Sequence, residues 1–197
     1  SLRWVAHEGS TDFDAFLGLN KAKNTAEALT AIEFATVANQ NFIVADREKN
    51  IGYYPHTKLP KRPWASASVP SWTPVPGDGS AEWDGWVDSA DLPRETDPLA
   101  GFIVTANNDP FGFSEDGRFD DDPWYYGSLF APGWRAGRIE EEVERLTARG
   151  EITVDDMIAL QLDTHSNLAD DLLPLLEDAR AQLETEPSLE AFRTRDD

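Results

Sequence analysis

Two adjacent asparagines, Asn107 and Asn108, are the residues of this sequence whose type and position first suggest chemistry. They follow the apolar run Gly101-Phe-Ile-Val-Thr-Ala and precede Asp109-Pro110. A carboxamide offers two N–H donors. Aimed at a carbonyl oxygen that becomes negative in a transition state, one such donor is worth about 10²–10³ in rate. The alternative is an ordinary turn, since asparagine tolerates left-handed backbone and hydrogen-bonds its own chain; the local pattern alone favours that turn.

The elements that must position these asparagines can be predicted from periodicity and end signals. Residues 101–106 are predicted to form a strand, and residues 41–46 and 51–54 a hairpin closed by a turn at 47–50. A capping box at Thr11-Asp-Phe-Asp14 predicts one short helix, and Thr25 is expected to cap a second. Further helices are predicted at 133–149, ended by Gly150, at 153–162, begun by a capping box at Thr153, and at 167–184.

A long proline-rich stretch, residues 58–98, separates the hairpin from the 101–106 segment, and helices cannot persist in it. A loop of this length in a compact domain is usually functional or packed on another segment. Five of the seven tryptophans lie in or near such loops: Trp64, Trp72, Trp83, Trp86 and Trp124. The order of elements predicts one α+β domain over residues 1–197, or part of a layered sandwich.

Composition excludes several classes of function. The chain has 37 Asp and Glu against 17 Lys and Arg, a formal net charge of −20, which disfavours nucleic acid and anionic membranes as partners. It has no cysteine, which excludes disulfides and thiolate catalysis. No apolar run approaches the roughly 20 residues of a membrane span. The three histidines show no zinc-binding spacing.

Several segments in order resemble the penicillin acylases (penicillin amidases), a family of N-terminal-nucleophile hydrolases. Residues 101–108 resemble the strand that carries the family's oxyanion-hole asparagine. Other segments resemble the family's hairpin (40–46 and 50–53), its proline-rich loop (73–78 and 83–86), the helix after the site (131–139) and a later helix (161–164). The matches run from residue 3 to about residue 176. Each is weak alone, but five in this order are specific.

The resemblance implies part of the αββα-layered fold of these hydrolases. They are made as precursors that cleave themselves and expose an N-terminal serine, whose own α-amino group acts as base. The resemblance assigns Asn107 to the oxyanion hole and Arg135 to a supporting role, with Arg138 as a weaker candidate. The complete enzyme would hydrolyse linear amides of N-acyl compounds, such as the side chain of β-lactams or acyl-homoserine lactones, the latter a quorum-quenching activity.

Ser1 is not expected to be the nucleophile. Leu2-Arg3-Trp4 resembles a segment deep inside the family's catalytic chain, and the interval to Asn107 is short for the family's layout. We therefore expect an internal piece of the catalytic β chain, inactive alone, with its nucleophile segment upstream. Its expected partners are the remainder of the acylase, including the α chain, and a small-molecule amide; exposed strand edges would favour self-association. The family resemblance implies a periplasmic or extracellular location.

The resemblance also implies a structural calcium ion, which takes six to eight oxygen ligands. The acidic residues Asp120, Asp121 and Asp122 lie near where one family ligand would fall. The chain has no EF-hand spacing, and a solvated acidic loop is the alternative reading of the cluster.

Two other functions remain open on the sequence. The first is a binding module whose tryptophan-rich loops, with Asp84, Asp88 and Asp91, hold a sugar or a peptide by stacking and hydrogen bonds. The second is a non-catalytic structural domain that is stabilised by calcium.

Overall fold

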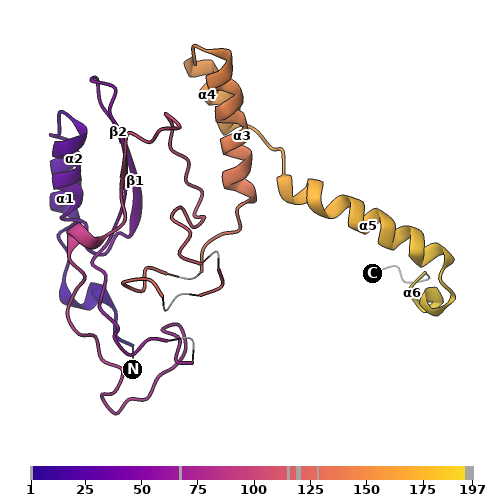
Figure 1. Cartoon of the computed structure of the whole chain (residues 1–197), viewed down its shortest axis with the longest axis horizontal. Coiled ribbons are helices and arrows are strands. Elements are labelled where there is room, and N and C mark those ends of the chain that lie inside the picture. The colour runs from indigo at the N-terminus through magenta and orange to yellow at the C-terminus, as the bar shows by residue number, and fades with distance from the viewer. Residues whose placement is uncertain (1, 67, 115, 119–120, 128, 194–197) are drawn as a thin grey trace. The chain divides into compact units, whose positions relative to one another are not determined.

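The computed structural model describes residues 2–66, 68–114, 116–118, 121–127 and 129–193, and these form two compact units. The first unit is Ser1–Ala131, drawn from indigo to magenta and rose in Figure 1, and the second is Pro132–Asp197, drawn from orange to yellow. The strands among the described residues all belong to the first unit, whereas the second unit is helical. The chain therefore has the mixed α and β composition predicted from its sequence.

The first unit is built on a three-stranded antiparallel sheet in the order β1-β2-β3. The strands are β1 (Gln40–Ala45), β2 (Ile51–His56) and β3 (Glu95–Thr96). Strands β1 and β2 pair in register from Gln40 opposite His56 to Ala45 opposite Ile51, which confirms the predicted hairpin. Strand β3, only two residues long, pairs with Gly52 and Tyr53 of β2 and was not predicted.

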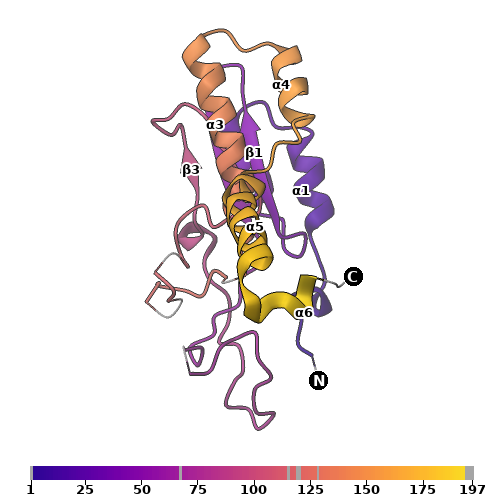
Figure 2. The same ribbon diagram turned by 90° about the vertical axis from the view of Figure 1, so that its right-hand side faces the viewer.

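Two short helices pack against this hairpin: α1 (Asp12–Leu19) and α2 (Thr25–Ile32). Figures 1 and 2 both show α1 running beside the hairpin, and the Phe16 ring of α1 lies 6.5 Å from the Phe42 ring of β1. The helices approach each other so closely that a Cβ on Gly18 would lie 2.7 Å from the Cβ of Ala31. Small residues on the two helices therefore allow Ile32 to be fully buried.

The predicted capping box at the start of α1 is wrong. Thr11 precedes the helix but makes no side-chain cap, and its Oγ1 donates instead to the carbonyl of Phe34 at 2.6 Å. Asp12 Oδ1 accepts from the backbone N–H groups of the loop after α2, including those of Thr36 at 2.6 Å and Val37 at 3.1 Å. These contacts with residues more than 20 positions away replace the local cap.

The predicted cap of α2 is displaced by one residue. Asn24 is the N-cap, and its Oδ1 accepts from the backbone N–H of Glu27 at 2.8 Å. Thr25 is the first helical residue and is buried, with its N–H and hydroxyl both directed to Asp46 Oδ2, at 3.1 and 3.3 Å. A carboxylate at the end of β1 therefore serves the start of α2, which no local sequence rule would indicate.

Asp46 also closes the hairpin turn. Its Oδ1 accepts from the backbone N–H groups of Glu48 and Asn50, at 2.9 and 3.0 Å, and Asn50 Nδ2 donates to Oδ2 at 2.9 Å. These hydrogen bonds lower the pKa of Asp46 to about 2, and the Asn50 side chain contributes most to the shift. The backbone N–H groups of Thr25, Asn50 and Glu48 lower the pKa further, whereas desolvation of the carboxylate raises it. The ionised form of Asp46 is therefore part of the fold.

We expect Asp46 to contribute to acid sensitivity in a defined pH window. Because its folded pKa of about 2 lies below the unfolded value of 3.8, its contribution is complete above about pH 4 and is lost as pH falls toward 2. A carboxyl-carbon NMR titration of the folded protein should give a midpoint near 2 for Asp46. A midpoint near 3.8 would show that these hydrogen bonds are absent in solution, and Asp46→Asn identifies the resonance.

The second unit consists of the helices α3 (Trp134–Arg149), α4 (Val154–Gln161), α5 (Asn167–Thr185) and the short α6 (Glu190–Arg193). The ends of α3, α4 and α5 were well predicted, whereas α6 was not predicted. Gly150 ends α3, and the capping box of Thr153 with Asp156 begins α4, as predicted. Short 3-10 helices occur in both units, at Val5–Glu8 and Ser89–Asp91 in the first and at Pro187–Leu189 in the second. None of the helices described has the length and apolar character needed to cross a membrane.

The predicted strand at 101–106 is wrong. This segment forms no ladder with a neighbouring strand among the described residues, although Phe102, Ile103 and Val104 are half-buried. Its link to the sheet is a side-chain contact, in which Asn41 Nδ2 donates to Thr105 Oγ1 at 3.2 Å. An apolar run predicts burial, but a strand also needs backbone partners, and those are set by tertiary packing.

Candidate functional site

The two asparagines lie in a turn in which they have different roles. Asn107 has a φ of 63°, in the left-handed region, and its carbonyl accepts from the Ala131 N–H at 2.7 Å. Asn108 Oδ1 accepts from the backbone N–H of Ala106 at 3.0 Å. The backbone conformation expected of a turn is thus confirmed, and Asn108 is the residue whose side chain closes it. The Asn107 side chain is exposed.

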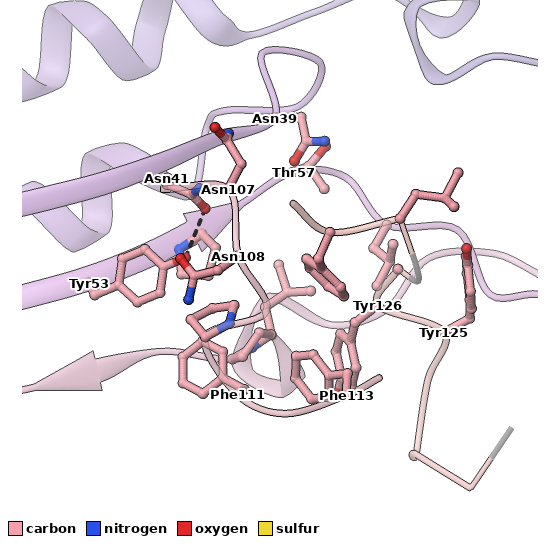
Figure 3. Close-up of a pocket in the computed structure, with 18 residues that line it drawn as sticks. Asn39, Asn41, Tyr53, Thr57, Asn107, Asn108, Phe111, Phe113, Tyr125 and Tyr126 are labelled. Atoms are coloured by element: carbon pink, nitrogen blue, oxygen red, sulfur yellow. Dashed lines mark hydrogen bonds between the residues drawn. The ribbon is translucent and has the colours of Figure 1, made fainter. Parts of the chain in front are cut away.

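Both asparagines line a pocket of about 410 Å³ in the first unit, shown in Figure 3. The pocket lies between the hairpin, the 107–113 segment and the loop at 125–130. Its lining residues are Asn39, Asn41, Tyr53, Pro55, Thr57, Leu59, Leu92, Pro93, Asn107, Asn108, Pro110, Phe111, Phe113, Tyr125, Tyr126, Gly127, Leu129 and Phe130. Four asparagines and a threonine thus share the pocket with a large number of aromatic and aliphatic side chains.

One wall of the pocket is a continuous series of aromatic rings. Tyr53 stacks on Phe111 with ring centroids 5.8 Å apart, Phe111 lies 5.8 Å from Phe113, and Phe113 stacks on Tyr126 at 4.3 Å. In Figure 3 the Asn107 carboxamide points away from the Phe111 and Phe113 rings, whereas Asn108 lies near Tyr53 and Phe111. The pocket therefore has a polar side and an apolar side, as small-molecule sites commonly do.

Hydrogen bonds tie the hairpin to the segment that leads into the asparagine turn. The Tyr53 hydroxyl donates to Asn41 Oδ1 at 2.9 Å (dashed in Figure 3), and Asn41 Nδ2 in turn donates to Thr105 Oγ1. Burial raises the pKa of Tyr53, and the negative charge of Asp109 adds to the shift. The phenol therefore stays protonated at ordinary pH and acts as a hydrogen-bond donor that positions the turn, not as a base.

Tyr126 is held in the same way on the opposite side. Its hydroxyl donates to the carbonyl of Asp91 at 3.0 Å. Burial raises its pKa, with further contributions from the charges of Asp122 and Asp91. Four of these site residues were not predicted from the sequence: Tyr53, Phe111, Phe113 and Tyr126. The alternation of Phe111 and Phe113 directly after the turn was the available signal, since alternate residues of an extended chain point to the same side.

The two predicted arginines lie in the second unit, outside the set of residues that line this pocket. Arg135 is an exposed residue in the first turn of α3. Arg138, the weaker candidate, is an ion-pair centre within its own unit, with Nη2 at 2.6 Å from Asp163 Oδ2 and 3.0 Å from Glu142 Oε1. These contacts assign Arg138 to the packing of the second unit.

The predicted calcium ligands are only partly described. Asp120 lies outside the described residues, as does Ser1. Asp121 Oδ2 lies 3.4 Å from Arg118 Nε. Burial raises the pKa of the half-buried Asp122, and the charges of Asp121, Asp116 and Asp109 raise it further. The described part of the chain contains no group of three or more His, Cys, Asp or Glu residues arranged to hold a metal ion.

Comparisons with known proteins agree on one family. A family model described as penicillin amidase matches residues 1–196. The chain is 34% identical over 160 residues to the penicillin acylase 2 proenzyme of Pseudomonas sp. (strain SE83), which covers 81% of this chain and 19% of that protein. It is 29% identical over 171 residues to the acyl-homoserine lactone acylase QuiP of Pseudomonas putida, covering 86% of this chain and 19% of that protein.

The fold agrees with these sequence matches. The thermostable penicillin G acylase from Alcaligenes faecalis superposes with a TM-score of 0.64 at 26% sequence identity, over 95% of this chain and 32% of that chain. The present chain spans about a fifth of the length of the two curated relatives. The similarity thus extends over nearly all of this chain but over a minor part of each relative.

Proposed function

The chain belongs to the penicillin amidase family, and from this premise we propose that it is a segment of an amidohydrolase that cleaves linear amides of N-acyl compounds. The relatives carry the names of a penicillin acylase and of acyl-homoserine lactone acylases, so amides of both kinds are candidate substrates. Both names describe removal of an acyl group from an amine, which is the reaction proposed here.

The observation that carries this proposal is the Asn107 carboxamide at the aromatic pocket. Its backbone is held by the Ala131 N–H and by the Asn108 turn, so the point from which the carboxamide extends is fixed beside the pocket. A donor that is already in place stabilises the oxygen of an amide carbonyl as that oxygen becomes negative during attack. The Tyr53, Phe111, Phe113 and Tyr126 rings would receive the apolar part of the substrate.

The remaining parts of the reaction are assigned to the complete enzyme. The nucleophile is proposed to be an N-terminal serine, exposed by autoproteolysis of the precursor and activated by its own α-amino group. An α-amino group has a pKa of roughly 7.7–8.0, so a useful neutral fraction exists near neutral pH. Arg135 is proposed to support the site or to orient the substrate. Without the nucleophile, this segment by itself is expected to be inactive.

A structural calcium ion, with Asp120, Asp121 and Asp122 among its ligands, remains part of the proposal. Burial raises the pKa of Asp122, and the charges of Asp121, Asp116 and Asp109 raise it further; a cation would relieve this concentration of negative charge. The described residues contain no group of three or more carboxylate or histidine side chains arranged to hold a metal ion, and no catalytic step is assigned to the ion. The calcium dependence of the melting temperature of the complete enzyme tests this point. A periplasmic or extracellular location is likewise proposed, on the family resemblance.

The tryptophans argue against the alternative of a sugar-binding or peptide-binding module. All five loop tryptophans are already engaged by the chain itself, including Trp72, whose ring centroid lies 6.3 Å from that of Tyr125. Trp64 Nε1 donates to the Glu82 carbonyl at 3.0 Å, and three other rings lie under cations: Trp83 under Arg3, Trp86 under Lys58 and Trp124 under Lys61. Rings that hold a long loop in place are less available as a stacking surface for a ligand.

Intact mass and N-terminal sequencing of the product of the complete gene test the enzyme class. We expect two chains, the larger starting with a newly exposed serine, together with hydrolysis of N-acyl amides. A single unprocessed chain without hydrolytic activity would contradict the proposal. In that case the family's fold would have been kept without its chemistry.

A further inference from the structure

A second pocket of the first unit has a different character from the Asn107 pocket. It has a volume of about 400 Å³ and is lined by Lys61, Arg62, Asp84, Asp122, Trp124 and Tyr125, among others. Tyr125 lines both pockets, so the two are adjacent. Two consecutive cations in one pocket are unusual in a chain with 37 acidic residues and a formal net charge of −20.

Arg62 is a half-buried cation that has aromatic neighbours but no carboxylate partner among the residues that the structure describes. Its guanidinium carbon lies 5.8 Å from the centroid of Trp83 and 5.6 Å from that of Tyr125. It forms no ion pair with any residue that the structure describes. Burial lowers its pKa, because removal of water disfavours the charged form. A charge in this state is stabilised when an anion binds to it.

Lys61 adds a second cation to the same pocket. Its Nζ lies 4.8 Å from the centroid of Trp124, and it too forms no ion pair within the described part of the chain. Two neighbouring cations behave differently. Arg3 Nη1 is 3.0 Å from Glu82 Oε2, and Lys58 Nζ is 3.3 Å from Glu8 Oε2. The basic side chains of this loop region therefore divide into paired ones outside the pocket and unpaired ones that line it.

The two acids of the pocket do not neutralise these cations. Asp84 is exposed, and neither Asp84 nor Asp122 is ion-paired with Lys61 or Arg62. The guanidinium and the ammonium thus remain available to a ligand.

We propose that the pocket of Lys61 and Arg62 binds the carboxylate of the substrate, beside the Asn107 pocket that receives the amide. Arginine presents a planar set of donors that matches a carboxylate with two parallel hydrogen bonds, and the aromatic rings hold that plane in position. The inference rests on the proposed amidohydrolase function and deepens it. It predicts a preference for amides that carry a carboxylate, as β-lactam antibiotics do, over acyl-homoserine lactones, which carry none.

A matched pair of substrates tests this subsite in the complete enzyme. One is an N-acyl-3-aminobenzoate, and the other is the N-acyl-3-aminobenzamide with the same acyl group. For Arg62→Gln we expect kcat/KM on the benzoate to fall about 10- to 100-fold, because a charge-assisted contact with the carboxylate is lost. The fall should come from a higher KM, with kcat little changed. The uncharged benzamide should be affected less than threefold. Arg47→Gln, which removes an exposed positive charge in the hairpin turn, is the control and should leave both substrates unchanged.

Equal effects of Arg62→Gln on both substrates, or no effect on either, would overturn the proposal. A binding measurement separates its failure from failure of the enzyme assignment. Titration with 3-aminobenzoate, followed by calorimetry, should show binding that is weakened at least tenfold in Arg62→Gln, and 3-aminobenzamide should bind more weakly to the wild-type protein. An enzyme without hydrolytic activity would refute the proposed function, while this titration would still decide whether Arg62 binds carboxylates. Equal affinity of both proteins for 3-aminobenzoate, or no binding to either, would refute the subsite.

Discussion

Replacement of Asn107 by alanine in the complete enzyme should lower kcat by about 10²–10³-fold, with KM little changed. The reason is that an oxyanion-hole donor acts on the transition state, in which the carbonyl oxygen becomes negative, and only weakly on the bound substrate. Single-turnover and steady-state kinetics on an N-acyl amide would measure the change in the chemical step.

The left-handed backbone at Asn107 requires a second variant as a control. Its φ of 63° is unfavourable for alanine, so Asn107→Ala could act through strain as well as through loss of the donor. Glycine adopts this conformation without cost, and Asn107→Gly removes the carboxamide alone. If Asn107 is the donor, the alanine and glycine variants lose activity equally. If glycine keeps activity within threefold of wild type while folding is intact, the backbone was responsible and the assignment fails.

Asn108→Ala provides a comparison from the same turn. Asn108 also lines the pocket, but its Oδ1 is used within the turn, as acceptor for the Ala106 N–H. We expect it to act by loosening the turn that holds Asn107, with a smaller loss of kcat than either Asn107 variant. A loss as large as that of Asn107→Gly would assign the donor to Asn108 instead.

Replacement of Ile32 by alanine should cause the largest loss of stability, about 2–5 kcal/mol. Ile32 is fully buried, in α2 against the sheet, and its core neighbours on the same helix, Ala28 and Ala31, are too small to fill the space that it leaves. The cost therefore includes a cavity as well as the lost burial. Equilibrium unfolding in urea, followed by tryptophan fluorescence, would report it as a lower midpoint with an unchanged slope.

Ile32→Val is the matched control for this change. It removes a single methylene group and keeps the branched shape, so the expected cost is about 0.5–1.5 kcal/mol. A graded loss from valine to alanine would confirm that packing around Ile32 limits the stability of the first unit. An alanine variant no less stable than the valine variant would show that the helices α1 and α2 collapse onto the sheet and fill the cavity.

The parts of this fold that could be predicted from sequence are those set by residues close together in the chain. The helices α3, α4 and α5 were located because their apolar spacing and end signals lie within one turn of the helix, as with the capping box at Thr153. The β1–β2 hairpin was located because its strands are joined by a short turn. Asn107 was found from the order of several segments that resemble one family, not from its own surroundings.

What the tertiary structure decided involves residues far apart in the chain. Asp12 binds the loop at Thr36 instead of capping its helix, and Asp46 orders the start of α2 from the end of β1. The 101–106 segment is apolar but forms no ladder with any described part of the chain, because strand pairing depends on partners that local pattern does not specify.

The candidate sites, too, depend on contacts between residues far apart in the chain. The stack of Tyr53 on Phe111 joins residues 58 positions apart, and Arg62 meets Tyr125 across 63 positions. The sequence by itself therefore determined the family, the local helices and hairpin, and the asparagine that is the candidate donor. Only the folded chain decided which rings surround that asparagine and that Arg62 lies half-buried between Trp83 and Tyr125, because such burial arises from contacts that loop closure brings together.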